Sequence, residues 1–288
     1  MIYNHILACD VGATRARIAI IDAHGNVAHK KVLNSVDSSP SILIDMIIQV
    51  LKESKLQVDG GVVGVAGPVD YESGQIIALP NLDSWDGFLS SDYLTSELQF
   101  EVLIANDADL AALGEHGFGA GLGFSNMVYI TVSTGIGSGI IVNDRLLKGR
   151  TSLGEIGHTI IDRTNLNTLE KLASGASLKK ITGLPADEVV KHVREKNLEY
   201  LGIFREFTRD LSIGIYNLCR IFSPDTVVIG GGLSNAGPLL LNPIRDFLFE
   251  NLNLHGKVPI VLSIAKCGDD SGLIGARVFW NNSRSNYA

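Results

Sequence analysis

Two short glycine-rich segments of the chain carry residue types that suit phosphate binding. Residues 132–140 read Val-Ser-Thr-Gly-Ile-Gly-Ser-Gly-Ile and lie between apolar runs at 127–130 and 140–142. Residues 10–14 read Asp-Val-Gly-Ala-Thr and close an apolar run that begins at residue 6. Glycine lets a ligand approach the main chain, and the N–H groups and hydroxyls of such turns suit an anion. One such turn is typical of an ordinary hairpin, but two of the same design indicate a duplicated nucleotide-binding unit.

Polar residues that could hold or deprotonate a hydroxyl group follow in three further segments. Asn106-Asp107-Ala108-Asp109 comes directly after the apolar run 102–105, where we expect a strand to lead into a helix. Gly154-Glu155-Ile156-Gly157-His158 places a carboxylate and an imidazole three positions apart, and Glu170 opens a later helical segment. Each has an ordinary structural explanation as well: a helix N-cap for Asp107, a buried core histidine for His158 and a first-turn helix carboxylate for Glu170.

The elements around these residues predict an α/β protein with two similar halves. Apolar runs bounded by turn residues predict strands at 6–11, 18–21, 27–33, 61–66, 102–105, 127–130, 140–142, 226–229 and 258–264. Helices are expected at 38–54, from 106–109 onward, at 198–222, from 230–232 to about 250 and at 271–280. No low-complexity linker separates the halves, so we expect two lobes joined by short crossings, with a cleft between them.

The composition argues against several classes of protein. A net charge of −7 disfavours a nucleic-acid partner, because binding to the phosphate backbone needs clustered Lys and Arg. The three cysteines form no CxxC pair, so neither a disulfide framework nor a zinc site is indicated. We expect a cytoplasmic protein without a membrane partner, because there is no leader-like start and no apolar run of roughly 18 residues. A P-loop is excluded, because the Gly-Lys pair at 256–257 is followed by Val.

Six segments, in this order along nearly the whole chain, resemble the motifs of the ROK family (repressor, open reading frame, kinase). They are residues 10–14, 106–109, 133–137, 154–158, 169–175 and 229–232. The resemblance implies an α/β, two-lobed actin-like ATPase (ribonuclease H-like) fold with duplicated β-hairpin phosphate-binding motifs and a central cleft. The predicted boundaries are 1–107 plus 271–288 for a smaller N-terminal lobe and 108–270 for a larger C-terminal lobe.

The resemblance also implies the role of each candidate residue at the acceptor side of the site. Asp107 is the expected catalytic base, in preference to Asp109, because the family motif places the base directly after Asn. We expect it in a rigid, exposed position where the helix dipole favours the carboxylate. The expected sugar-binding residues are Asn106, Glu155, His158 and Glu170. Asn81 and Asp83 are weaker candidates for contact with the sugar or for closure of the lobes.

A second set of residues is expected to bind ATP and its magnesium ion. The residues implied to bind the phosphates are Gly12, Thr14, Thr134, Gly135 and Gly137. Asp10 is expected near Mg²⁺, through water, and could otherwise be a turn-capping aspartate. Gly231 and Gly232 are assigned to the adenosine side. Ser133 stands where many relatives carry glycine.

The function implied is ATP-dependent phosphorylation of a hexose, and the chain looks most like the glucokinases of the family. N-acylmannosamine, fructose and allose remain alternative substrates. A sugar-responsive regulator is less expected, because the first motif lies within ten residues of the start and leaves no room for a DNA-binding domain. A chaperone-like ATPase without a sugar is disfavoured by the four sugar-site residues.

Two further expectations concern metal and assembly. Many relatives carry a cysteine-rich zinc motif after the Gly-His pair, but residues 159–168 contain no cysteine, so no structural zinc is expected. How this shortened segment is braced is left open by the sequence. Relatives are often dimers or tetramers, and we expect a homo-oligomer here too.

Overall fold

Two sheets with the same strand topology form the framework of the protein. The computed structural model describes residues 4–12, 15–34, 40–78, 90–151, 154–252 and 260–285. Within these residues, one five-stranded sheet has the order β3-β2-β1-β4-β7 and the other has the order β10-β9-β8-β13-β14. In each, the first three strands are antiparallel and the last two run parallel to the third. The predicted duplication is therefore present in the strand order.

The strands of the first sheet are β1 (His5–Val11), β2 (Arg15–Asp22), β3 (Val27–Asn34), β4 (Gly61–Val65) and β7 (Val102–Asn106). Those of the second sheet are β8 (Met127–Val132), β9 (Ile136–Val142), β10 (Arg145–Leu146), β13 (Thr226–Gly230) and β14 (Val261–Ile264). Two small hairpins stand outside them, β5 (Val69–Asp70) with β6 (Gln75–Ile76), and β11 (Ile160–Asp162) with β12 (Asn167–Thr168).

The helices are α1 (Pro40–Ser54), α2 (Ser91–Leu98), α3 (Asp107–Phe118), α4 (Leu169–Ala173), α5 (Gly175–Thr182), α6 (Ala186–Arg194), α7 (Leu198–Phe222), α8 (Pro238–Asn251) and α9 (Ser271–Ser285). Among the described residues, none of them combines the length and the apolar character that crossing a bilayer requires.

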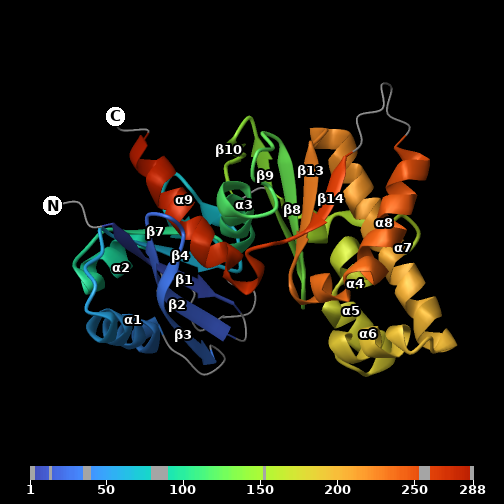
Figure 1. Cartoon of the computed structure of the whole chain (residues 1–288), viewed down its shortest axis with the longest axis horizontal. Coiled ribbons are helices and arrows are strands. Elements are labelled where there is room, and N and C mark those ends of the chain that lie inside the picture. Colours follow the sequence, from blue (N-terminus) through green and yellow to red (C-terminus); the bar gives the residue numbers. More distant parts are fainter. Residues whose placement is uncertain are drawn as a thin grey trace.

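Helices α3 and α9 lie side by side between the two sheets (Figure 1). Side chains on β1 alternate between a cluster under α1 and α2 and a cluster that includes α3 and α9. Side chains on β8 alternate between that same shared cluster and one under α6, α7 and α8. Because the shared cluster contains residues of both sheets, the two helices form a common layer at the centre of the molecule.

Most of the predicted elements are confirmed, with limited changes of boundary. The helix predicted at 198–222 is α7 (Leu198–Phe222), and its predicted apolar face is buried from Phe204 to Leu218. The last helix, α9, continues beyond the predicted end to Ser285. Helix α2 and the short helices α4, α5 and α6 were not individually predicted. The predicted start at residue 38 and strand start at 258 lie outside the described residues. The predicted lobe boundaries stay a prediction.

Candidate functional site

The junction of β7 and α3 places Asn106 and Asp107 at the centre of the candidate site. Asn106, 6% exposed, caps the helix: its Oδ1 accepts hydrogen bonds from the N–H groups of Ala108 and Asp109, at 3.0 and 3.1 Å. Its Nδ2 donates to the carbonyl oxygen of Gly67 over 3.1 Å. The N-cap is therefore Asn106, and the alternative reading of Asp107 as the cap is wrong. The sugar-binding role of Asn106 stays a prediction.

Asp107 is the first residue of α3, and its carboxylate lies half-buried rather than exposed as expected. Burial raises the pKa of this carboxyl group to about 7, and the negative charge of Asp10 adds to the rise. A hydrogen bond of 2.8 Å from the N–H of Ala108 opposes it, and Glu155 contributes a further, smaller increase. The first turn of a helix does favour an anion, but here the loss of hydration outweighs that effect.

Asp109, the competing candidate for the base, is fully buried. Its Oδ2 accepts a hydrogen bond of 2.5 Å from the hydroxyl of Tyr71, and that hydroxyl in turn accepts one of 3.2 Å from the N–H of Asn106. Burial raises the pKa of Asp109 to about 7 as well, so the pKa does not distinguish the two carboxylates. Accessibility does distinguish them, because only Asp107 retains exposed surface, and this supports Asp107 as the base.

Tyr71 is a part of the site that sequence reasoning missed. It lies just beyond β5, and no motif or spacing connects it to the segment at 106–109. The ammonium group of Lys148 lies over the ring of Tyr71, with Nζ 4.7 Å from the ring centroid. The local sequence signal near Tyr71 is a Gly-Pro turn at 67–68. A turn of this kind does not predict a contact with Asp109, which lies 38 positions further along the chain.

Asp10 lies near the end of β1, directly opposite Arg17 in the β1–β2 ladder. The Arg17 guanidinium approaches the Asp10 carboxylate to 2.8 Å. Burial raises the pKa of Asp10, and the charge and hydrogen bond of Arg17 oppose that rise. At the start of α9, a Cβ atom on Gly272 would lie 3.9 Å from Cγ of Asp10 and 3.8 Å from the carbonyl oxygen of Asp107. The two carboxylate-bearing residues thus meet at the start of α9.

The donor set around Asp10 fits a hydrated magnesium ion. Mg²⁺ in phosphate-binding sites usually keeps several waters and uses one or two carboxylates. Asp10 supplies one carboxylate, and the charge of Asp10 reaches Asp107 strongly enough to raise the pKa of Asp107. Within the described ranges, no group of three or more His, Cys, Asp and Glu side chains is arranged to hold a metal ion directly. A water-mediated contact through Asp10 alone, which also pairs with Arg17, is compatible with this donor set.

The first glycine turn connects β1 to β2. The N–H of Gly12 donates to the carbonyl oxygen of Arg15 over 2.9 Å and so closes the turn. Thr14, a predicted phosphate ligand, lies outside the described residues, as do Asn81 and Asp83. The contribution of these three residues to the site therefore stays a prediction.

The second glycine turn, between β8 and β9, is held by elements that carry other predicted residues. The carboxylate of Glu170, in the first turn of α4, accepts a hydrogen bond of 2.9 Å from the N–H of Ile136. A Cβ atom on Gly135 would lie 2.5 Å from Oε2 of Glu170, so a larger residue would displace this carboxylate. The N–H of Ala176, at the start of α5, donates to the carbonyl oxygen of Thr134 over 3.0 Å.

Gly137 brings this same hairpin against the start of α3. A Cβ atom on Gly137 would lie 3.2 Å from Cβ of Ala108, the residue after the candidate base. The hairpin therefore touches both the helix that bears Asp107 and the helix that bears Glu170. The predicted phosphate-binding turn is therefore in contact with the helix of the candidate base and with the helix of Glu170, a predicted sugar-binding residue.

Glu155 and His158 lie together on a single 3₁₀ turn, Ile156–His158 and its N-cap. Nε2 of His158 lies 3.8 Å from Oε2 of Glu155, and the two side chains are 68% and 42% exposed. Burial raises the pKa of Glu155, with the charge of His158 opposing and that of Glu170 adding to the rise. The alternative reading of His158 as a buried core histidine is wrong, because its ring is open to solvent.

The shortened segment 159–168 is braced by the side chain of Asp162. One carboxylate oxygen accepts hydrogen bonds from the N–H groups of Thr164 and Asn165, and the other accepts from the side-chain amides of Asn165 and Asn167. This turn closes the β11–β12 hairpin, which leads from His158 directly into α4 and Glu170. A hydrogen-bonded turn therefore supports the segment.

The glycines at 230–232 end β13 and lead into a 3₁₀ turn at 232–236 before α8. Gly231 has φ of +79°, and a Cβ atom there would lie 2.5 Å from the carbonyl oxygen of Val132. A side chain is thus excluded where β13 passes β8. Nothing lies within 4 Å of a Cβ atom on Gly232, which is exposed, and the assignment of both glycines to the adenosine side stays a prediction.

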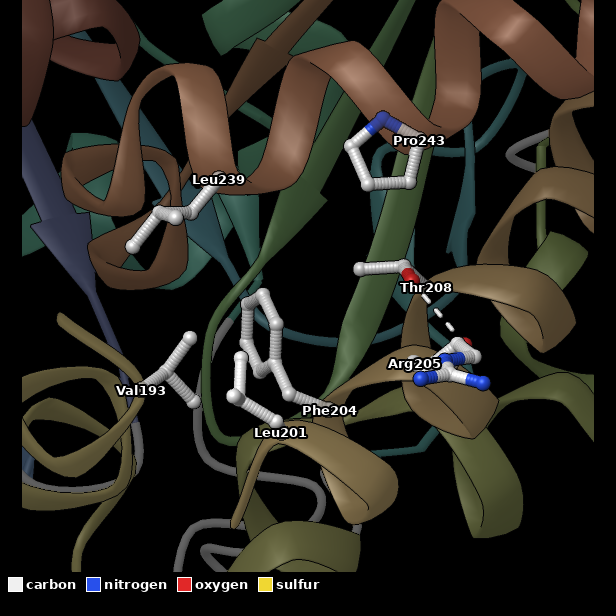
Figure 2. A pocket seen from close by; sticks show the side chains of 7 residues that line it. All are labelled: Val193, Leu201, Phe204, Arg205, Thr208, Leu239 and Pro243. Atoms are coloured by element: carbon white, nitrogen blue, oxygen red, sulfur yellow. Dashed lines mark hydrogen bonds between the residues drawn. The ribbon is translucent and has the colours of Figure 1, made fainter. Parts of the chain in front are cut away.

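A separate cavity of about 250 Å³ lies between α6, α7 and α8 (Figure 2). Its lining is mainly apolar and includes Val193, Phe204 and Leu239, with Arg205 and Thr208 at one side. None of the lining residues belongs to the predicted site. The candidate site is therefore defined by the convergence of polar residues at the start of α3, and not by this cavity.

Comparison with known proteins bears on this arrangement. Residues 6–283 match the ROK family. A glucokinase from Thermotoga maritima is 27% identical over 94% of this chain and 95% of its own. A xylose repressor from Caldicellulosiruptor bescii is 25% identical over 94% of this chain and 76% of its own. The crystal structure of a ROK family glucokinase from Streptomyces griseus, in complex with glucose and AMPPNP, is 26% identical, covers 96% of this chain and 98% of its own, and has a TM-score of 0.82. This likeness confirms the predicted α/β fold of the actin-like ATPase type.

Proposed function

The chain belongs to the ROK family, and from this membership we propose that it is a sugar kinase that transfers the γ-phosphoryl group of ATP to a hexose. Glucose is the first candidate acceptor and glucose 6-phosphate the first candidate product, because glucokinases are among the similar proteins. N-acylmannosamine, fructose and allose are the alternative acceptors. We also propose that the protein acts in the cytoplasm as a homodimer or homotetramer.

One observation supports this proposal most directly: the carboxylate of Asp107 lies at the start of α3 with its pKa raised to about 7. A general base works best when its pKa is close to the operating pH. Asp107 would accept the proton of a sugar hydroxyl while the oxygen of that hydroxyl forms a bond to the γ-phosphorus. The bond from the γ-phosphorus to the bridging oxygen breaks at the same stage, and ADP leaves.

The glycine turns would hold the phosphates on either side of this base. Main-chain groups at Gly135 and Gly137 and the hydroxyls of Thr14 and Thr134 are suited to phosphate oxygens, and Gly12, whose own N–H donates to Arg15, would let the phosphates approach the first turn. Asp10 would hold a hydrated Mg²⁺ on the phosphates, and such an ion supplies neutralisation of charge at the transferred group. Gly231 and Gly232 would present main chain to the adenosine.

The sugar would lie on the side of Asp107 that faces the second sheet. Glu155 and His158 share one 3₁₀ turn, and the charge of Glu170 acts on Glu155. Carboxylate, imidazole and amide groups, the last from Asn106, match the paired donors and acceptors of a pyranose. A site built in this way rejects analogues that lack a hydroxyl, because its polar groups would be left unpaired.

A sugar-responsive regulator without kinase activity is the second candidate, and the similarity to a xylose repressor supports it. The deciding experiment is a panel of hexoses with ATP and Mg²⁺, scored by kcat/KM in a coupled ADP assay. We expect turnover of at least one hexose, and the variant Asp107→Asn should bind that hexose and lose about 10²–10⁴-fold in kcat. Sugar binding by calorimetry without turnover of any hexose would favour the regulator, and near-normal turnover in Asp107→Asn would refute the base assignment.

A further inference from the structure

Glu115, near the end of α3, is a fully buried carboxylate that the proposed mechanism does not use. Its Oε1 accepts hydrogen bonds from the N–H of Cys267 at 2.7 Å and the hydroxyl of Ser271 at 2.8 Å. Its Oε2 accepts from the N–H groups of Ala120 at 2.8 Å and Lys266 at 2.9 Å. All four bonds have a charged acceptor, which makes each of them stronger than a bond between neutral groups.

The four donors come from the segments by which the chain passes between the two sheets. Ala120 follows α3, which leads from β7 of the first sheet to β8 of the second. Lys266 and Cys267 follow β14 of the second sheet, and Ser271 begins α9, which returns to pack on the first sheet. One carboxylate thus holds the outgoing and the returning connection together.

These connections meet where α3 and α9 approach most closely. A Cβ atom on Gly114 would lie 2.1 Å from the carbonyl oxygen of Ser271, and one on Gly275 would lie 1.7 Å from the carbonyl oxygen of Leu110. Main chain therefore touches main chain at this crossing (Figure 1). α3 packs on β8 and β9, whereas α9 packs on β1, β2 and β4, so the crossing joins the two sheets mechanically.

The crossing continues directly into the candidate site. Ser271, which Glu115 holds, precedes Gly272, and a Cβ atom on Gly272 would lie 3.9 Å from Cγ of Asp10 and 3.8 Å from the carbonyl oxygen of Asp107, so this glycine lies beside both residues. We propose that Glu115 is a positioning residue for phosphoryl transfer: it fixes the crossing of α3 and α9 and thereby the placement of Asp10 against Asp107. The inference rests on the proposed kinase function.

The substitution Glu115→Gln tests this with little change of shape. An amide has one acceptor oxygen, so at least one main-chain donor loses its partner and the new NH₂ group faces N–H groups. Since a displacement of about 1 Å can cost about 10²-fold in rate, we expect kcat to fall at least tenfold while the KM for the sugar changes less than about threefold. Glu206→Gln, at an exposed position of α7, is the matched control and should behave like the wild type.

The thiol of Cys267 gives a readout that does not depend on catalysis. Cys9 and Cys219 are buried, whereas Cys267 is partly exposed and its N–H is held by Glu115. We expect iodoacetamide to label Cys267 several-fold faster in Glu115→Gln than in the wild type, measured by peptide mass spectrometry.

A second variant covers the case in which Glu115→Gln does not fold, as judged by circular dichroism. A Cβ atom on Gly119 would lie 2.1 Å from Oε2 of Glu115, so Gly119→Ala displaces the carboxylate without removing it and should produce the same two changes. Wild-type kcat in the folded variants, even with a lower melting temperature, would show a purely structural role and overturn the inference. A wild-type protein that phosphorylates no hexose would refute the kinase proposal instead, so the two failures are distinct.

Discussion

The hydroxyl of Tyr71 donates a hydrogen bond of 2.5 Å to the carboxylate of Asp109, across 38 positions of sequence. The same hydroxyl accepts a hydrogen bond from the N–H of Asn106, so it holds two residues that flank the proposed base. Within the described residues, the second carboxylate oxygen of Asp109 has no hydrogen-bond partner. Tyr71 therefore donates a direct hydrogen bond to a buried carboxylate two positions from the proposed base.

We expect Tyr71→Phe to lower the free energy of unfolding by about 1–3 kcal/mol, because it leaves a buried carboxylate and a buried N–H without their shared partner. It should also reduce kcat, because the start of α3 loses a support. Urea denaturation and steady-state kinetics measure the two effects. Tyr216→Phe is the control, since the hydroxyl of Tyr216 accepts its hydrogen bond from the exposed Arg220 side chain, and it should change stability by less than about 0.5 kcal/mol. Equal effects of the two variants would contradict the role given to Tyr71.

The rate should fall in acid because the proposed base must be ionised. With the pKa of Asp107 raised to about 7, we expect kcat/KM to decrease below that pH, by about tenfold per pH unit. Asp109→Asn separates the two candidates, because its amide oxygen can still accept from Tyr71. If Asp107 is the base, this variant keeps an acidic limb, moved slightly to lower pH by the loss of a neighbouring charge. Disappearance of the limb in Asp109→Asn would assign the base to Asp109.

Stability should respond to pH in the opposite sense to activity. Burial raises the pKa of Asp109 in the folded protein to about 7, far above its value of 3.8 in an unfolded chain. The folded state therefore binds a proton more tightly, and the stability contributed by this protonated group is lost as pH rises toward 7. We expect the free energy of unfolding of Asp109→Asn, relative to that of the wild type, to increase as the pH is raised from 5 to 8. Urea denaturation at each pH measures this difference. A stability difference that stays constant over this range would count against a perturbed Asp109.

The local parts of this site follow from the sequence, and its long-range partners do not. An apolar run followed by Asn106 predicts a strand that ends at a helix cap, because both signals lie within a few residues. The spacing of Phe204, Phe207 and Leu211 likewise predicts one buried face of α7. Tyr71 and Glu115 carry no such signal, since their partners are set by the packing of distant segments. The partial burial of Asp107 was missed for the same reason: the charges and bulk around it come from other elements.

The contact between Gly135 and Glu170 gives a further prediction. Gly135→Ala should push the carboxylate of Glu170 away from the N–H of Ile136, because the added Cβ atom would lie 2.5 Å from its Oε2. We expect higher KM values for both ATP and the sugar, since one movement disturbs the proposed phosphate-binding turn and the proposed sugar-binding residue Glu170 together. Gly202→Ala on α7, where nothing lies within 4 Å of the new atom, is the matched control. A change confined to one of the two KM values would show that Glu170 does not connect the two sides.

The turn centred on Asp162 is expected to support sugar binding. Asp162→Ala removes the acceptor of two main-chain and two side-chain hydrogen bonds, and the hairpin between His158 and Glu170 loses its brace. Because that hairpin leads between two proposed sugar-binding residues and does not carry the proposed base, we expect the sugar KM to rise about three- to tenfold with little change in kcat. Asp187→Ala, at an exposed position in α6, should leave both constants unchanged.

Since hydrogen bonds brace the segment 159–168, dialysis against EDTA should not change the melting temperature, and assay with excess Mg²⁺ should then restore full activity. A melting temperature that falls after EDTA and recovers with Zn²⁺ would instead reveal a structural metal.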